Sequence, residues 1–181
     1  MSVARRRLAE SPSAARYEHE HTALPSAGAH QGKAVTRLRA TPLAPFERDG
    51  LKSALSKAGL PADDLGKSSA LFWRFETPQD VPVGFGGLEI FGTDALLRSI
   101  VILPVLRRSG FGRAIVAAIE QEAQAHNCRA LYLVTSDAEF FSRQGYDPCG
   151  RDAVPATVRE SGEFAVQAEP ARKAMVKHLV A

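Results

Sequence analysis

Two apolar strands on either side of one amphipathic helix constrain the fold more than any other feature of this sequence. The first, ALLRSIVIL, ends at Leu103, and the second, ALYLVT, spans residues 130–135. Between them, apolar residues recur on one face of a helix expected from Gly110 to His126. Continuous apolar runs are typical of strands buried on both faces, so the segment predicts a right-handed β-α-β crossover with two parallel strands.

The residues before this crossover predict further strands. LFWRFE (Leu71–Glu76) and VGFGGLEIF (Val83–Phe91) are aromatic and β-branched runs separated by prolines, so together with ALLRSIVIL they predict an antiparallel meander. A short strand is expected at residues 34–40, followed by a helical stretch that begins after Pro42 and runs through Ala58. We therefore expect an α/β (α+β) fold, in which a mixed central sheet combines an antiparallel N-terminal meander with a parallel β-α-β core.

The residues after the crossover carry weaker signals. Asp137 is expected to cap a short helix that runs through Arg143. Two weaker strands, near residues 146–151 and 172–179, are expected to finish the chain.

Length and composition set the domain organisation. The chain has 181 residues, which corresponds to one domain with about 30 residues to spare. Residues 1–33 are rich in Ala, Ser, Arg and His and lack an apolar period, so we expect a disordered tail before a single domain at residues 34–181. An Arg-rich start also suits a transit peptide, although three glutamates count against it. No apolar run reaches the roughly 18 residues of a membrane helix, so the cytoplasm is the expected location.

The charge and the cysteines argue against several classes of protein. The net charge is +3, and the first 33 residues carry five cationic and three acidic side chains, which leaves residues 34–181 nearly neutral at +1. Without a dense basic stripe, nucleic acid is not an expected partner, and no membrane partner is expected because no apolar run is long enough. Cys128 and Cys149 have no CxxC or Cys/His spacing, so neither a disulfide scaffold nor a metal site is expected.

The loop RRSGFGRA between the first parallel strand and the helix is the most informative motif. Gly110 and Gly112 allow a tight turn that exposes backbone N–H groups at a helix N-terminus, where the helix dipole favours an anion. Arg107, Arg108 and Arg113 add donors suited to phosphate oxygens, so the loop predicts a pyrophosphate site. The loop lacks the GxxxxGK[ST] pattern and the third glycine of GxGxxG, which disfavours ATP and NAD.

This loop and the elements around it resemble the GNAT superfamily of N-acetyltransferases over about Leu71 to Leu179. The segment Arg107–Gly112 matches the superfamily's R/Q-x-x-G-x-G/A loop, and the order of meander, loop, helix, strand, helix and Gly-Tyr matches its core. The resemblance implies acetyl-CoA as co-substrate, lying where the two parallel strands splay apart, and no metal. The cofactor-binding residues that it implies are Ile100, Val101, Ile102, Arg107, Arg108, Ser109, Gly110, Phe111, Gly112, Arg113 and Phe140.

Within the superfamily, the segments ALLRSIVILP, LYLVTSDAEFFSRQGY and RDAVPATVRESGEF resemble the arsenic-resistance branch and, more distantly, acetylglutamate-synthase-type acetyltransferases. Both imply a small amino-acid-like amine as acceptor, and the first implies detoxification of an organoarsenical or phosphinate analogue of glutamate. The alternatives are an acetylglutamate-synthase-type amino-acid acetyltransferase and a non-catalytic acyl-CoA sensor. The expected partners are a small-molecule amine and a second copy of the chain in a homodimer.

Two departures from the superfamily's pattern affect the chemistry. Phe140-Phe141 stand where many relatives place a tyrosine that protonates the leaving thiolate. Tyr132, Tyr146, water or solvent could supply this proton, or the thiolate leaves unassisted, which its pKa of about 8 to 9 permits. The arsenic-resistance relatives also tend to carry a cysteine after the pair found here as Glu163-Phe164, whereas AVQAEP follows in this chain, so thiol-dependent recognition of arsenic is not expected.

The resemblance also implies the catalytic groups. The backbone N–H of Val101, with Ile102 as the alternative, is expected to bind the oxyanion of the tetrahedral intermediate. Glu89 lies on the strand that borders the acetyl site, so it is expected to act as general base or to bind the substrate ammonium. A solvated strand carboxylate is the alternative interpretation of Glu89.

The remaining candidates are substrate-binding residues. An arginine on a buried strand needs an acidic partner, so Arg98 either grips a substrate anion or forms a structural pair with Glu89 or Glu76. Thr135 and Ser136 end the second parallel strand, where they either reach the cofactor or substrate or cap the following helix.

Overall fold

The computed structural model describes residues 37–66, 69–166 and 171–180. Contacts divide the chain into two units, Met1–Lys33 and Ala34–Ala181, and the fold given below is that of the second unit. The expected tail at residues 1–33 lies outside the described residues. Within the described ranges, no helix is both long and apolar enough to cross a membrane.

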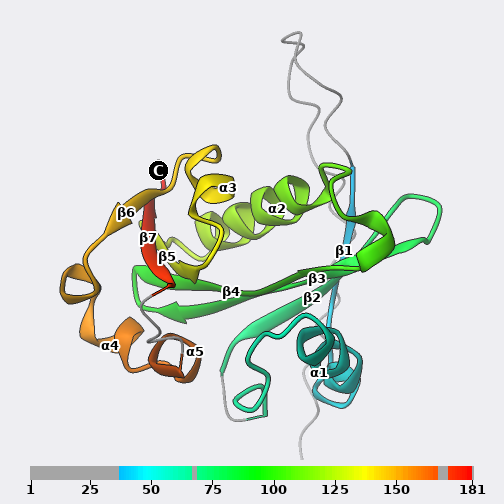
Figure 1. Ribbon diagram of the computed structural model, residues 1–181, viewed down its shortest axis with the longest axis horizontal. Helices are drawn as coiled ribbons and strands as arrows, with labels where there is room; N and C mark the ends of the chain where they lie inside the picture. The colour runs from blue at the N-terminus through cyan, green and yellow to red at the C-terminus, as the bar shows by residue number, and fades with distance from the viewer. Residues whose placement is uncertain (1–36, 67–68, 167–170, 181) are drawn as a thin grey trace, which may run out of the picture. The chain divides into compact units, whose positions relative to one another are not determined.

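The described residues form a seven-stranded sheet in the order β1-β2-β3-β4-β5-β7-β6 (Figure 1). Neighbouring strands are antiparallel except β4 and β5, which are parallel. This confirms the predicted mixed sheet with its antiparallel meander and parallel crossover. The strands are β1 Arg39–Pro42, β2 Leu71–Glu76, β3 Pro82–Phe91, β4 Asp94–Ile102, β5 Ala130–Thr135, β6 Asp147–Cys149 and β7 Lys173–His178.

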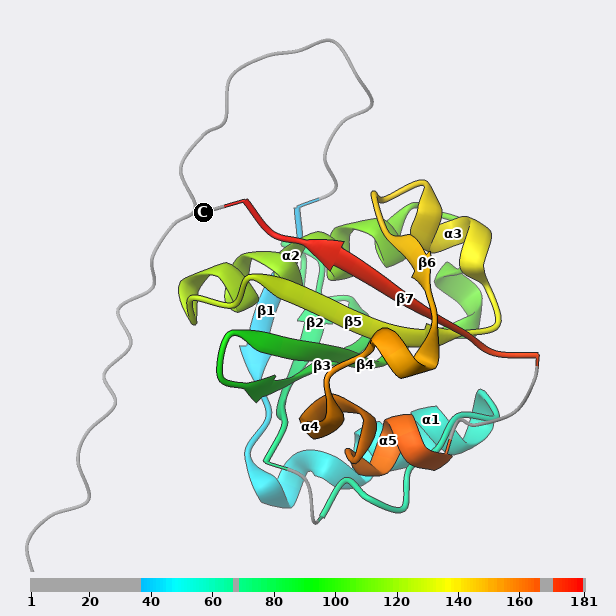
Figure 2. The same cartoon turned by 90° about the vertical axis from the view of Figure 1, so that its left-hand side faces the viewer.

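Helices cover both faces of the sheet. Figures 1 and 2 show α2 and α3 on one face and α1, α4 and α5 on the other. The α-helices are α1 Arg48–Lys57, α2 Phe111–Ala125, α3 Ala138–Ser142, α4 Ala156–Arg159 and α5 Gly162–Val166, and short 3-10 turns are η1 Pro45–Glu47, η2 Pro104–Leu106 and η3 Arg151–Ala153.

The apolar core explains why the two central strands are continuous apolar runs. On one face, Ile115 and Ile119 of α2 belong to a buried cluster with Leu131 and Leu133 of β5. On the opposite face, α1 forms a second cluster with Phe72 of β2. α4 and α5 form a third cluster with Leu96 of β4 and Tyr132 of β5. Because helices cover both faces of the sheet, few side chains on either face of β4 and β5 reach water. Both alternating sets of residues are therefore mainly apolar.

The first strand and the segment after residue 146 differ in part from what the sequence predicts. Among the described residues the first strand begins at Arg39, and residues 34–36 of the expected strand lie outside the described ranges. Pro42 ends this strand, paired with Trp73, instead of opening the helix. This placement is tolerated because a proline without an N–H fits an edge strand. The two weaker strands expected near residues 146–151 and 172–179 are confirmed as β6 and β7, but the sequence did not predict η3, α4 and α5, which lie between them within residues 151–166. Helices of four or five residues are too short to show a helical period.

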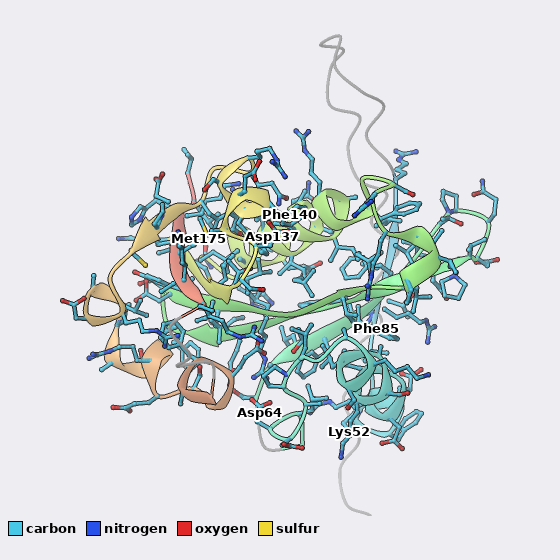
Figure 3. The ribbon with its side chains drawn as sticks, in the orientation of Figure 1. Lys52, Asp64, Phe85, Asp137, Phe140 and Met175 are labelled. Carbon is cyan, nitrogen blue, oxygen red and sulfur yellow. The ribbon has the colours of Figure 1, made fainter. Side chains whose placement is uncertain are left out.

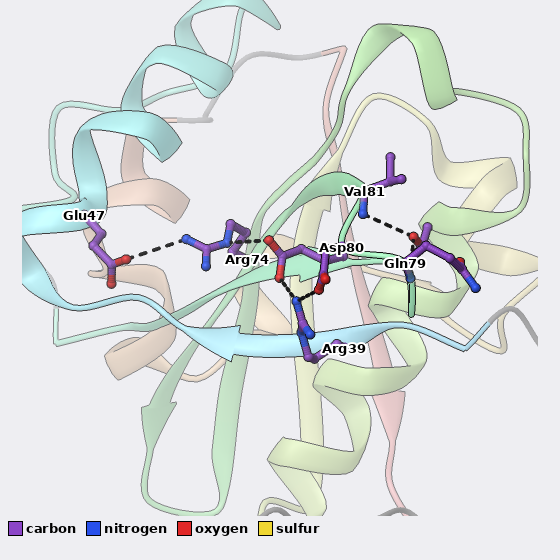
Figure 4. A network of polar contacts seen from close by, with 8 residues as sticks. Arg39, Glu47, Arg74, Gln79, Asp80 and Val81 are labelled. Atoms are coloured by element: carbon purple, nitrogen blue, oxygen red, sulfur yellow. Dashed lines mark hydrogen bonds and ion pairs between the residues drawn. The ribbon is translucent and has the colours of Figure 1, made fainter.

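A network of ion pairs fastens the edge strand β1 to the sheet (Figure 4). The guanidinium of Arg39 contacts Glu76 at 2.7 Å and also Asp80. Arg74 contacts the same Glu76 at 3.1 Å and reaches Glu47 at 3.6 Å. The hydrogen bond from Arg39, with help from Arg74, holds the pKa of Glu76 below its usual range.

The lowered pKa of Glu76 makes a prediction about stability and pH. A carboxylate whose pKa falls on folding contributes stability above its unfolded pKa of about 4.3, and this contribution is lost as pH falls further. Thermal unfolding should therefore show a lower melting temperature for Glu76→Gln than for wild type at pH 6, and a smaller gap at pH 3. Asp80→Asn is the control, because its side chain is 71% exposed and should give a smaller gap at pH 6. A gap for Glu76→Gln that is equal at both pH values would contradict the prediction.

Candidate functional site

The parallel strands β4 and β5 pair only over their first part. Their register joins Asp94 to Ala130, Ala95 to Leu131 and Leu96 to Tyr132, and ends there. β4 continues to Ile102 alongside β3, and β5 continues to Thr135 alongside β7. The two strands therefore part beyond Leu96 and Tyr132, which leaves backbone groups on their facing edges available to a ligand.

A bulge in β4 lies just beyond the point of parting. Gly87 pairs with Arg98 and Phe85 pairs with Val101, so one β3 residue stands opposite two β4 residues, Ser99 and Ile100. Ser99 has φ of 56°, in the left-handed region that side chains rarely adopt. A bulge redirects the strand that follows it, here Ile100–Ile102, the residues predicted to bind the pantetheine arm.

The predicted pyrophosphate loop connects the end of β4 to α2. Gly110 is the N-cap of α2 with φ of 81°, and Arg108 also has a positive φ, of 65°. The side chains of Arg107, Arg108 and Arg113 are exposed, and Arg107 Nε donates to the Ile102 carbonyl at 3.4 Å. The first N–H groups of a helix have no partner one turn back, so this end of α2 offers donors and a positive dipole to an anion.

The structure brings Phe140 to this loop from α3. Asp137 caps α3 by accepting the Phe140 N–H at 3.1 Å, as the sequence predicted. A Cβ at Gly112 would lie only 3.1 Å from Phe140 Cζ, so the ring covers the first turn of α2. Figure 3 shows Asp137 and Phe140 on the face of the sheet opposite to Asp64.

Gly110 gives a test of the loop with a matched control. Gly110→Val should weaken CoA binding tenfold or more. Valine is strained at a φ of 81°, so the loop would shift its N–H groups, and each lost contact to a phosphate costs about 1.5 to 3 kcal/mol. Titration calorimetry with CoA measures the change. Gly59→Val is the control: Gly59 also has a positive φ, and a Cβ added there would meet nothing within 4 Å, but it follows α1, far along the chain from the loop. Equal CoA affinity in folded Gly110→Val and wild-type protein would contradict the assignment.

On the opposite face of the sheet, Arg98 of β4 is enclosed by carboxylates. Its side chain is 0% exposed and lies 2.6 Å from Asp64, 2.8 Å from Glu89 and 2.8 Å from Glu163. The predicted structural pair with Glu89 is present, whereas Glu76 pairs with other arginines. Burial raises the pKa of Glu163, and the charge of Arg98 acts in the opposite direction. One guanidinium thus contacts three acidic side chains.

A pocket of about 350 Å³ opens beside this cluster. Its lining includes the carboxylates of Asp64, Glu89 and Glu160, together with Phe91 and Ser161. Glu89 is only 6% exposed, so the solvated carboxylate considered for it from sequence does not match its surroundings. Because the described lining residues are acidic, polar or apolar, the pocket favours a cation such as an ammonium group.

The other predicted residues are spread along the edges of the opening. Val101 is buried, and Ile100 and Ile102 are half-buried. Thr135 is buried and its Oγ1 accepts the Asp137 N–H at 2.9 Å, so it supports the cap of α3, whereas Ser136 is exposed.

The two tyrosines considered as proton donors are both buried. Tyr132 belongs to the cluster under α4 and α5, and Tyr146 lies beside Phe141 and Lys177. Burial raises the pKa of both phenols, which makes each a weaker acid.

Sequence reasoning missed two of the three carboxylates around Arg98. The need for acidic partners was visible, because an arginine stood on a buried strand. Asp64 lies in the loop after α1, and Glu163 lies on a short helix that the sequence pattern did not predict. Nothing local in the sequence links Arg98 to an acid 34 positions before it, or Ser99 to one 64 positions after it.

Strands that part beside a helix N-terminus with exposed arginines suit a protein that holds an acyl-CoA thioester, and comparison with known proteins shows the family. The chain belongs to the acetyltransferase (GNAT) family, whose model matches residues 38–150. It is 30% identical over 90 residues to an amino-acid acetyltransferase of Mycobacterium tuberculosis. That match covers 48% of this chain and 52% of the relative, so it spans about half of each protein.

Two solved structures have a similar fold. Rv2747 from Mycobacterium tuberculosis, solved in complex with CoA, gives a TM-score of 0.64 at 21% identity, covering 78% of this chain and 99% of that one. N-acetylglutamate synthase from Neisseria gonorrhoeae, solved with CoA and N-acetyl-glutamate, gives 0.66 at 14% identity, covering 80% of this chain and 36% of that one. At these identities the likeness shows the fold.

Proposed function

We propose that the protein transfers the acetyl group of acetyl-CoA to the amino group of a small amino-acid-like molecule. The observation that carries this proposal is the parting of β4 from β5 after Leu96 and Tyr132, next to the loop that begins α2. In this proposal the pyrophosphate binds at Arg107–Arg113, and the pantetheine arm follows Ile100–Ile102. The thioester then lies in the opening between the strands.

The proposed chemistry uses one carboxylate and one backbone donor. Glu89 takes a proton from the acceptor ammonium, directly or through water, and the neutral amine attacks the thioester carbonyl. The N–H of Val101 or Ile102 stabilises the oxyanion that forms. The C–S bond then breaks, and the nitrogen of the new amide gives up its second proton to the departing CoA thiolate or to solvent. No tyrosine acid is needed, since a thiol pKa of about 8.5 makes the thiolate an adequate leaving group.

The acidic pocket supports the amine half of the substrate. Asp64, Glu89 and Glu160 surround a space that attracts an ammonium group. The guanidinium of Arg98 already contacts three carboxylates, so we propose that it fixes Glu89 rather than gripping the substrate. Ser136 is exposed at the end of β5 and is proposed to contact the cofactor or the acceptor.

Two substrate classes fit the proposal. Acetylation of a proteinogenic amino acid such as glutamate is supported by the relative named as an amino-acid acetyltransferase. An organoarsenical or phosphinate analogue of glutamate is supported by the sequence resemblance of residues 151–164 and 131–146 to the arsenic-resistance branch.

A screen of acceptors with the full chain tests the function. Free CoA is measured with a thiol reagent after acetyl-CoA is added together with each of the protein amino acids, phosphinothricin and an arsenate-bearing glutamate analogue. The proposal expects CoA release above the acceptor-free rate for at least one amino-acid-like amine. Saturable acetyl-CoA binding without acceptor-dependent release would contradict it in favour of an acyl-CoA sensor.

A further inference from the structure

Glu163 of α5 contacts the bulge of β4 across 64 residues of sequence. Its carboxylate accepts the Ser99 N–H at 3.4 Å and the Ser99 hydroxyl at 3.2 Å. The same carboxylate lies 2.8 Å from Arg98 Nε, and Glu163 is 9% exposed. One buried carboxylate therefore holds two consecutive residues of β4 at the position where the strand contains an extra residue.

The conformation of Ser99 requires such support. A residue other than glycine with φ of 56° is in a strained backbone region, and it stays there only when its surroundings hold it. Hydrogen bonds to one buried side chain oppose a return to the ordinary backbone region, because both would be lost when Ser99 turned away. The contacts with Glu163 reach both the backbone N–H and the side chain of the strained residue.

We propose that Glu163 is a positioning residue that holds Ser99 in its left-handed conformation and thereby aims the backbone of Ile100–Ile102 into the opening between β4 and β5. This inference rests on the proposed function, because the thioester would be polarised by an N–H of that segment. A small error in the direction of an oxyanion donor lowers the rate of the chemical step more than it lowers the affinity for the cofactor.

The placement of Glu163 separates it from the proposed base. Its neighbours Ser161 and Gly162 line the acidic pocket, as does Glu89, whereas the Glu163 carboxylate faces Ser99 and Arg98. Removing it leaves Arg98 in contact with Asp64 and Glu89, so no unpaired guanidinium results. A variant at this position is therefore expected to fold.

Four variants of the full chain test the inference with acetyl-CoA and the best acceptor from the screen. Glu163→Ala should lower kcat by about 10- to 100-fold, with less than a threefold change in KM for acetyl-CoA. Glu163→Gln keeps an oxygen that accepts from Ser99, and should retain kcat within about fivefold of wild type. Ser99→Gly removes the cost of a positive φ, so adding Glu163→Ala to it should lower kcat by only about threefold further.

Three results would overturn the inference. The first is unchanged kcat in folded Glu163→Ala, and the second is an equal effect of Glu163→Ala with and without Ser99→Gly. The third is a loss in Glu163→Gln as large as in Glu163→Ala, which would show that an oxygen accepting from Ser99 does not sustain turnover. Asp152→Asn, an exposed carboxylate on the same C-terminal segment, is the control and should behave as wild type.

Hydrogen exchange separates failure of this inference from failure of the proposed function. The Ser99 amide should exchange slowly in wild type and at least tenfold faster in Glu163→Ala, whether or not the protein turns over acetyl-CoA. Absence of turnover in wild type would contradict the proposed function alone. An equally protected Ser99 amide in both proteins would contradict the positioning role alone.

Discussion

Arg98→Leu is expected to destabilise the domain by about 3 to 5 kcal/mol, the range for removing one partner from a buried ion pair. The substitution removes the guanidinium from three carboxylates that lie within 2.8 Å of it, and leaves them facing one another in a buried site. Equilibrium unfolding in urea measures the change. Without Arg98, the buried acids bind protons more tightly in the folded protein than in the unfolded chain. The loss of unfolding free energy should therefore be smaller at pH 5 than at pH 8.

An exposed arginine provides the matched control. Arg143 pairs with Glu139 on α3, and the two side chains are 63% and 84% exposed. Arg143→Ala should cost no more than about 0.5 kcal/mol, since exposed pairs are screened by water and salt. An unfolding free energy for Arg98→Leu within about 1 kcal/mol of wild type would contradict the buried cluster and reopen a direct role for Arg98 in substrate binding.

Glu89→Gln is expected to lower turnover by roughly a hundredfold, the lower range for loss of a general base. The glutamine preserves the shape of the side chain and an oxygen facing Arg98, but it cannot accept the proton of the ammonium. The deficit should shrink as pH rises, because more of the acceptor is then already neutral. Initial rates of CoA release from pH 6 to pH 10 measure this dependence.

Glu160→Gln is the control for the base, because Glu160 lines the same pocket from its exposed side. Its loss should raise the acceptor KM and change kcat by less than about threefold, as expected for a contact that only attracts the ammonium. A Glu89→Gln deficit that stays constant over the whole pH range would contradict a base role and leave Glu89 as a binding or structural carboxylate.

The centre of the fold could be predicted because its signals are local and long. The apolar runs of β4 and β5 are continuous, the apolar face of α2 recurs at helical spacing over the whole helix, and glycine and asparagine mark the helix termini. The loop at Gly110 follows from the same segment. The three-residue extent of the β4–β5 pairing and the bulge at Ser99, by contrast, have no local signal, because serine gives no sign of a positive φ.

The surroundings of Arg98 could be predicted only in part. A buried arginine needs acidic partners. Glu89 lies on the neighbouring strand β3, so its pairing with Arg98 could be predicted from the sequence. Asp64 and Glu163 reach the same guanidinium through tertiary packing of segments with no clear period. Predicted secondary structure therefore locates β4, whereas the number of acids around Arg98 depends on how α1 and α5 pack against the sheet.

Transfer of a labelled acetyl group tests the central claim most directly. The full chain is incubated with acetyl-CoA carrying carbon-13 at both acetyl carbons and with the best amine from the screen, and the products are examined by mass spectrometry. The account predicts an N-acetylated amine that carries both labelled carbons, in amounts equal to the CoA released and greatly reduced with Glu89→Gln. Release of CoA with labelled free acetate and no labelled amide would contradict it.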